Sequence, residues 1–107
     1  MPGTVNWKAT YQGSGPAAVL ELFSASSEDA GPVVTKPCPC NPCIGCPWPM
    51  ENLAFGGYKA AISSGSDRYF YVEGVDPITS PNTFANGTTV TLSQSHPEAL
   101  VKIRVVT

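Results

Sequence analysis

The chain has 107 residues, which is the size of a single domain and long enough to bury a hydrophobic core. Charged residues account for 13% of it, about half the usual share, while its apolar content is ordinary, and this combination excludes a disordered chain. The net charge is −2 and no basic run occurs, so nucleic-acid binding is not expected; the cations are scattered over Lys8, Lys36, Lys59, Arg68, Lys102 and Arg104.

The sequence shows no membrane or export signal. No apolar run reaches the length that spans a bilayer, and residues 1–7 lack the charged and apolar regions of a signal peptide. A low-charge surface rich in Ser, Thr and Gly favours a secreted or particle-associated protein over a cytoplasmic one, and the compartment stays open.

The first third of the chain reads as strands. Residues 4–12 alternate strictly, with Val5, Trp7 and Ala9 on one face, which is typical of a half-buried strand. Residues 17–25 carry apolar side chains on both faces, which predicts a central or covered strand. Residues 33–35 are expected to be a short edge strand.

The second half contains further strands separated by turn signals. Residues 58–64 and 68–75 are predicted to form a hairpin through Ser64-Gly65-Ser66-Asp67. A short extended piece is expected at residues 83–85, followed by an Asn86-Gly87 turn. The last two strands are then expected at the ranges 88–93 and 99–106.

Six to seven strands at regular spacing, with no convincing amphipathic helix, predict an all-β fold. We expect an antiparallel two-sheet sandwich, immunoglobulin-like or transthyretin-like, with a small β-barrel as the alternative. One domain is expected over residues 1–107, with residues 36–49 as an inserted Cys/Pro-rich loop.

The inserted loop contains all four cysteines and five prolines. Because prolines lack an N–H group and restrict the preceding residue, the stretch is predicted to be neither a helix nor a central strand. Its composition therefore predicts a rigid loop on a sandwich that folds without it.

The four cysteines are spaced C-x-C-x-x-C-x-x-C, and clustered thiolates are good ligands for soft metals. Residues 40–47 resemble the C-x-x-C-x-x-C run of ferredoxins, although a ferredoxin run continues to a Cys-Pro three residues further on. This resemblance implies an iron–sulfur cluster; zinc and copper are the other candidates. The candidate metal ligands are Cys38, Cys40, Cys43 and Cys46.

Disulfides and free thiols are the alternatives to a metal. Four cysteines allow three pairings, and each bridge would close so short a loop that it adds only about 1–2 kcal/mol. A redox enzyme of the C-x-x-C type is disfavoured, because Pro47 and Pro49 exclude the helix that normally follows such a motif.

Aromatic residues give the remaining candidate site. Trp48, between two prolines, is expected either to pack beneath the loop or to be exposed as an anchor for a partner or a sugar. Tyr58, Tyr69 and Tyr71 would extend such a binding surface, or else form ordinary cross-strand pairs.

No catalytic set of residues is apparent, so an enzyme is not expected. The leading hypothesis is a structural or binding module whose Cys/Pro/Trp loop serves self-assembly or recognition of a protein or carbohydrate. The alternative hypothesis is a metal- or redox-active protein that uses the four cysteines.

Overall fold

The computed structural model describes residues 3–13, 15–38 and 44–107, and for Cys46 it describes the backbone alone. These residues form eight β-strands and one short 3-10 helix. The elements in chain order are β1 (Gly3–Gln12), β2 (Val19–Ser24), β3 (Pro32–Pro37), β4 (Cys46–Leu53), β5 (Gly56–Ser64), β6 (Asp67–Phe70), η1 (Phe84–Asn86), β7 (Thr89–Leu92) and β8 (Glu98–Val106).

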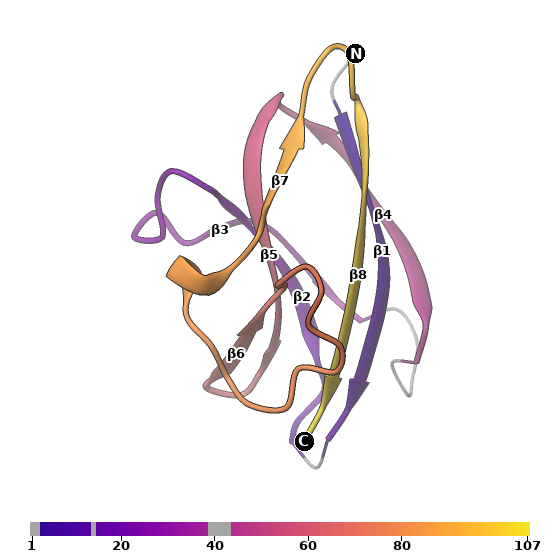
Figure 1. Cartoon of the computed structure of the whole chain (residues 1–107), viewed down its shortest axis with the longest axis vertical. Coiled ribbons are helices and arrows are strands. Elements are labelled where there is room, and N and C mark those ends of the chain that lie inside the picture. The colour runs from indigo at the N-terminus through magenta and orange to yellow at the C-terminus, as the bar shows by residue number, and fades with distance from the viewer. Residues whose placement is uncertain (1–2, 14, 39–43) are drawn as a thin grey trace.

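The strands form two sheets, so the all-β prediction is confirmed (Figure 1). The smaller sheet has the order β4-β1-β8, and the larger one the order β3-β2-β5-β6 with β7 also paired to β5. No described strand belongs to both sheets, and the two sheets do not close into a barrel. The barrel alternative is therefore wrong.

The smaller sheet is mixed, which corrects the expectation of antiparallel pairing throughout. Strand β1 runs antiparallel to β4 but parallel to β8, in register from Thr4 opposite Glu98 to Gln12 opposite Val106. Figure 1 shows β1 and β8 side by side with both arrows pointing the same way. The first and last strands of the chain are therefore direct neighbours.

The larger sheet is built around β5. Strand β2 lies along one edge of β5, while β6 and β7 occupy successive halves of its other edge. The predicted hairpin is confirmed, since β5 and β6 are antiparallel, but its second strand ends at Phe70 and not at residue 75. Gly65 in the turn has a φ of 62°, a value that glycine adopts without strain.

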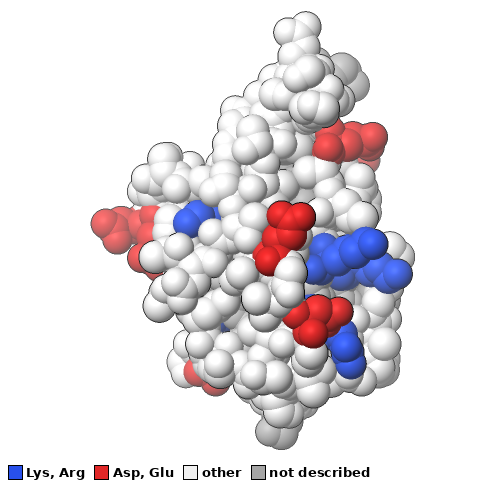
Figure 2. Space-filling model, in the orientation of Figure 1, with Lys and Arg blue, Asp and Glu red and all other residues white. Residues whose placement is uncertain are grey.

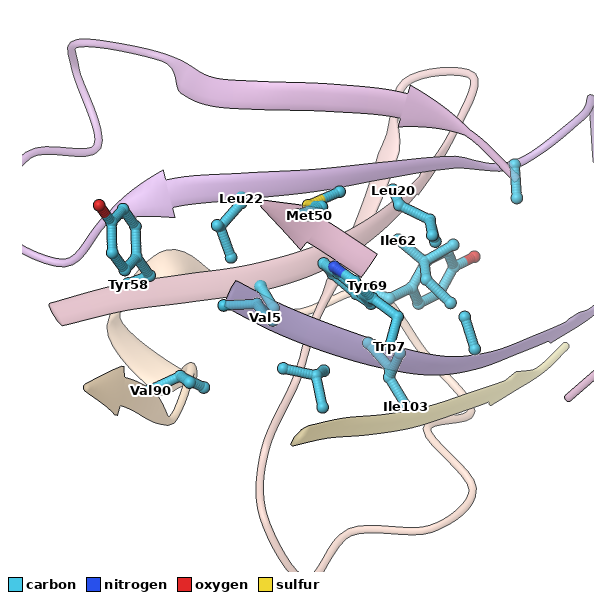
Figure 3. Packing of buried hydrophobic residues seen from close by; sticks show 14 of the residues in the cluster. Val5, Trp7, Leu20, Leu22, Met50, Tyr58, Ile62, Tyr69, Val90 and Ile103 are labelled. Atoms are coloured by element: carbon cyan, nitrogen blue, oxygen red, sulfur yellow. The ribbon is translucent and has the colours of Figure 1, made fainter. Parts of the chain in front are cut away.

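The core lies between the two sheets. Alternate residues of β1 and β8 point inward and are buried, as the alternation predicted, and they meet side chains from β2 and β5. Figure 3 shows Trp7 from the smaller sheet facing Leu20 and Ile62 from the larger one. Each fully buried side chain of this size contributes about 1.5–3 kcal/mol, so this layer dominates stability.

The outer face of the larger sheet carries a second, smaller cluster. Phe23, Ala61 and Phe70 are buried there, and Phe84 of η1 packs over them with its ring 5.7 Å from that of Phe70. The prediction of a central or covered strand in residues 17–25 is therefore confirmed, since β2 lies inside the sheet and its Phe23 is buried on the outer face.

Two local predictions were wrong. Residues 46–49, expected to be part of a loop, begin strand β4, which continues to Leu53. Residues 83–85 were expected to be extended and Asn86-Gly87 to be a turn, but residues 84–86 form the 3-10 helix η1, and Gly87 caps it at a φ of −69° instead of a positive φ.

Candidate functional site

The Cys/Pro-rich segment connects an edge strand of one sheet to an edge strand of the other. It leaves β3 and returns as β4, and its described flanks are fixed to the body of the protein. The Cys38 N–H donates to the Ala18 carbonyl at 3.0 Å, and the Gly45 N–H donates to Thr10 Oγ1 at 2.8 Å. The segment is therefore held at both ends.

The metal-ligand prediction falls largely outside the described residues. Cys40 and Cys43 are not described, and neither is the side chain of Cys46. Cys38 packs against the main core and is disulfide-bonded. The described residues contain no group of three His, Cys, Asp or Glu side chains placed to hold a metal ion.

Trp48 lies on β4 directly opposite Trp7 of β1. It is partly buried and packs against the main core. The indole N–H groups of both tryptophans are buried without a hydrogen-bond partner among the described residues. Neither donor is available at the surface to bind a sugar or a partner.

The three predicted tyrosines do not form one exposed surface with Trp48. Tyr58 and Tyr69 are core residues, and burial raises the pKa of each hydroxyl above its ordinary value, with Asp67 adding to the rise for Tyr69. Tyr71 is half-buried, and its pKa is raised by burial and by Glu73. Tyr58 lines one surface hollow and Tyr71 lines another, and both hollows are described below.

The sheet edges are protected against pairing with another strand. On β4, Pro47 and Pro49 are two residues apart, so their missing N–H groups fall on the same side, which we assign to the free edge. Along β8, Ile78 forms a parallel bridge with Val105, in which the Ile78 N–H donates to the Arg104 carbonyl.

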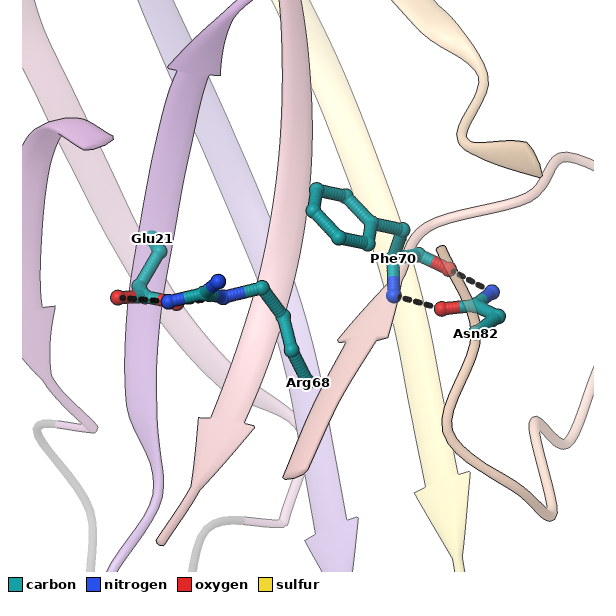
Figure 4. Close-up of polar contacts among 4 residues, drawn as sticks. All are labelled: Glu21, Arg68, Phe70 and Asn82. Atoms are coloured by element: carbon teal, nitrogen blue, oxygen red, sulfur yellow. Dashed lines mark hydrogen bonds and ion pairs between the residues drawn. The ribbon is translucent and has the colours of Figure 1, made fainter. Parts of the chain in front are cut away.

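The larger sheet is protected in a similar way. The amide of Asn82 bonds to both the N–H and the carbonyl of Phe70 on β6, where a neighbouring strand would otherwise bind (Figure 4). Strand β3 is only six residues long, has proline at both ends and contains a bulge at Val33. Assembly through strand addition is therefore disfavoured at these four edges, and side-chain surfaces become the candidates.

An uncharged hollow lies where β3, the end of β4 and the start of β5 meet. It has a volume of about 760 Å³, and none of its lining residues is charged. Val33 and Phe55 line it and are 51% and 44% exposed. Large apolar side chains exposed side by side around a hollow are typical of an interaction site.

A charged groove of about 490 Å³ lies between the outer face of β1 and β8 and the loop of residues 71–76. Its charged residues are Lys8, Lys102, Arg104, Glu73 and Asp76. Lys8 and Lys102 are directly opposite each other in the parallel register. Arg104 Nη1 lies 3.6 Å from Asp76 Oδ1 and forms an ion pair with it. Figure 2 shows basic and acidic side chains gathered beside one another on one face of the molecule.

The sequence did not predict this groove, because its cations are scattered along the chain. It forms because β1 and β8, almost a hundred residues apart, are paired, and the outward positions of both strands then share one face. Neither Lys8 nor Lys102 has an ion-pair partner among the described residues.

Comparisons with protein-family models, with curated proteins and with solved structures find no match. Among the described residues, no helix has the length and hydropathy needed to cross a membrane. The candidate sites therefore depend on the geometry of this chain alone.

Proposed function

We propose that this chain is a non-catalytic assembly module, a two-sheet sandwich of the immunoglobulin-like or transthyretin-like kind that binds a second copy of itself through the uncharged hollow. The observation that carries the proposal is the hollow itself, with Val33 and Phe55 half exposed among its uncharged lining residues. Such a surface is expected to be covered in the functional state.

A second copy is the partner that suits this surface best. The exposed side chain of Phe55 lies next to an uncharged depression, so the surface contains both a projection and a recess. Under a two-fold axis, each Phe55 can enter the recess of the other copy, which is the self-complementarity that a symmetric dimer requires. Since no charged residue lines the hollow, apposing two copies brings no like charges together there.

Light scattering coupled to size exclusion tests this proposal. We expect the wild-type protein to be a dimer at about 1 M salt, because apolar contacts are not screened by ions. Val33→Asp and Phe55→Asp should each give a monomer, since either substitution places an unpaired carboxylate in the contact.

Leu100→Asp is the matched control, because Leu100 is 53% exposed but lies on β8, away from the hollow. This variant should remain dimeric. A wild-type protein that is monomeric at every accessible concentration in 1 M salt, or a dimer unaffected by both hollow variants, would refute the proposal.

A metal or redox role for the four cysteines is the alternative function. The disulfide at Cys38 speaks against a four-thiolate site, because a disulfide sulfur is no longer a thiolate ligand. Elemental analysis with thiol titration distinguishes the two. Near-stoichiometric zinc, copper or iron together with titratable thiols after metal removal would support the alternative.

Carbohydrate recognition through Trp48 is a further version of the binding role. It is disfavoured because the Trp48 N–H is buried and the tryptophan packs against the core. A glycan array with wild-type protein and the Trp48→Phe variant tests it, and glycan binding lost in the variant would support it.

A further inference from the structure

The charged groove over β1 and β8 has a complement elsewhere on the same molecule. The turn between β2 and β3 carries Glu28 and Asp29, both exposed and without an ion-pair partner among the described residues. Figure 1 shows this turn projecting from the body of the protein, and Figure 2 shows acidic side chains at that projection. The turn is shaped by a hydrogen bond from the Gly31 N–H to the Glu28 carbonyl at 3.0 Å.

We propose that the groove binds the Glu28-Asp29 turn of another copy of this chain. This inference rests on the proposed assembly role but uses a second, separate contact. Two adjacent carboxylates on a projection match two adjacent ammonium groups, Lys8 and Lys102, in a recess. Because the groove and the turn are different surfaces, the contact is head-to-tail and can propagate from copy to copy.

The repulsion between the lysines of the groove is evidence that the groove binds an acidic ligand. Like charges on directly opposite residues of neighbouring strands are destabilising, and Lys8 and Lys102 occupy such positions with no acid paired to either of them in the described part of the chain. Glu73 and Asp76 lie on the far wall, and only Asp76 reaches a cation, Arg104. An incoming pair of carboxylates would relieve the repulsion between the two lysines.

The charge of the rest of the chain favours a short acidic segment over a long polyanion. Three of the six cations and two of the eight acids line the groove, which leaves three cations and six acids elsewhere. A polyanion longer than the groove would meet this acidic surface and be repelled. A two-residue acidic turn makes contact only where the cations are.

Charge exchange with light scattering tests the proposal. At about 10 mM salt, where the Debye length is about 30 Å, wild-type protein should form species at least about twice the mass seen at 1 M salt. Lys8→Glu/Lys102→Glu and Glu28→Lys/Asp29→Lys should each lose this increase. An equimolar mixture of the two variants should regain it, because each variant offers the charges that the other now lacks.

Lys36→Glu is the matched control, since Lys36 is an exposed lysine on β3 outside the groove, and it should associate as the wild type does. No low-salt increase in mass, or an increase unaffected by both charge-reversal variants, would overturn the inference. A third result would also overturn it: the Lys8→Glu/Lys102→Glu variant loses binding to heparin but keeps the low-salt increase in mass.

The experiments test the contact at the hollow and the contact at the groove independently of each other. Loss of the dimer in Val33→Asp at 1 M salt concerns the hollow, whereas loss of the low-salt increase concerns the groove. A salt-independent dimer with no low-salt growth leaves the proposed function standing and removes the head-to-tail contact.

Discussion

Glu21 is a buried charged residue of the larger sheet, 8% exposed on the outer face of β2. Arg68 of β6 donates to both of its carboxylate oxygens, at 2.7 and 3.4 Å, as Figure 4 shows. The guanidinium also lies 5.0 Å from the centre of the Phe23 ring. The pair thus crosses β5, which separates β2 from β6 in the sheet, and ties the two strands together.

Removing the cation alone should cost more than removing both charges. A fully buried pair loses about 3–5 kcal/mol when one partner is deleted, and because Arg68 is partly exposed we expect about 2 kcal/mol for Arg68→Ala. The double variant Glu21→Leu/Arg68→Leu should recover most of this loss. Urea unfolding of the three proteins measures it; equal losses in the single and double variants would contradict the argument.

The tyrosines give a pH dependence at the alkaline end. The pKa values of Tyr58, Tyr69 and Tyr71 are raised, chiefly by burial, so the folded chain keeps protons that the unfolded chain releases above a pH of about 10. Their contribution to stability is complete below that pH and is lost as the pH rises through the folded values.

We therefore expect the free energy of unfolding to fall as the pH rises above about 10, and to fall less steeply in Tyr58→Phe. The variant should be less stable at neutral pH by about 1 kcal/mol, because the Tyr58 hydroxyl donates to the Ala54 carbonyl. Urea unfolding at several alkaline pH values measures the slope. Identical slopes for the two proteins would show that Tyr58 does not contribute.

At the scale of single elements, strict alternation predicted what it physically determines, namely which face of a strand is buried. Val5, Trp7 and Ala9 point into the core as expected, and so do Val101 and Ile103. The sequence did not predict β4, because the prolines excluded a helix and a central strand and the segment was expected to be a loop, whereas β4 is an edge strand. Proline removes only an N–H group, and at a free edge that group has no partner to lose.

The prolines of β4 should therefore act against aggregation. Pro47→Val/Pro49→Val restores two N–H groups at the free edge and keeps the fold, because those side chains are exposed. We expect little change in thermal unfolding but faster aggregation, with thioflavin binding, at high protein concentration. Pro81→Val, in an exposed loop, is the control and should not aggregate faster; an equal rate for both variants would contradict the prediction.

The candidate sites were less predictable than the strands. The sequence left Tyr58 and Tyr69 open between a binding surface and cross-strand pairs, because alternation alone does not say which face of β5 or β6 meets the other sheet; both are buried. The hollow depends on where the end of β4 meets the start of β5, and no local pattern around Phe55 encodes that meeting. Sequence reasoning could at most have noticed that Phe55 precedes two glycines outside any alternating run.

For the whole molecule, the decisive feature is the parallel pairing of β1 with β8. Parallel neighbours need a long connection, and here the connection is nearly the entire chain. Short-range turn signals cannot reveal such a pairing, which is why the antiparallel expectation failed and why the groove over Lys8 and Lys102 was not foreseen.

This topology makes the last strand essential to the first. Val101, Ile103 and Val105 are buried in the core, and at about 1.5–3 kcal/mol each their loss removes roughly 5–9 kcal/mol. Deleting β8 also leaves β1 without the strand that pairs with it along its length. Since the total stability of a domain is about 5–15 kcal/mol, we expect a fragment of residues 1–97 to be unfolded at room temperature.

Proton NMR dispersion and near-ultraviolet circular dichroism of this fragment measure the effect. The matched control is deletion of Thr107 alone, which removes one backbone hydrogen bond to Gln12 and should cost no more than about 1 kcal/mol. A dispersed NMR spectrum together with cooperative unfolding of residues 1–97 would mean that β4 and β1 form a stable layer without β8. The larger sheet would then be the part of the molecule that holds the fold, and the pairing of the first and last strands would serve mainly to build the charged groove.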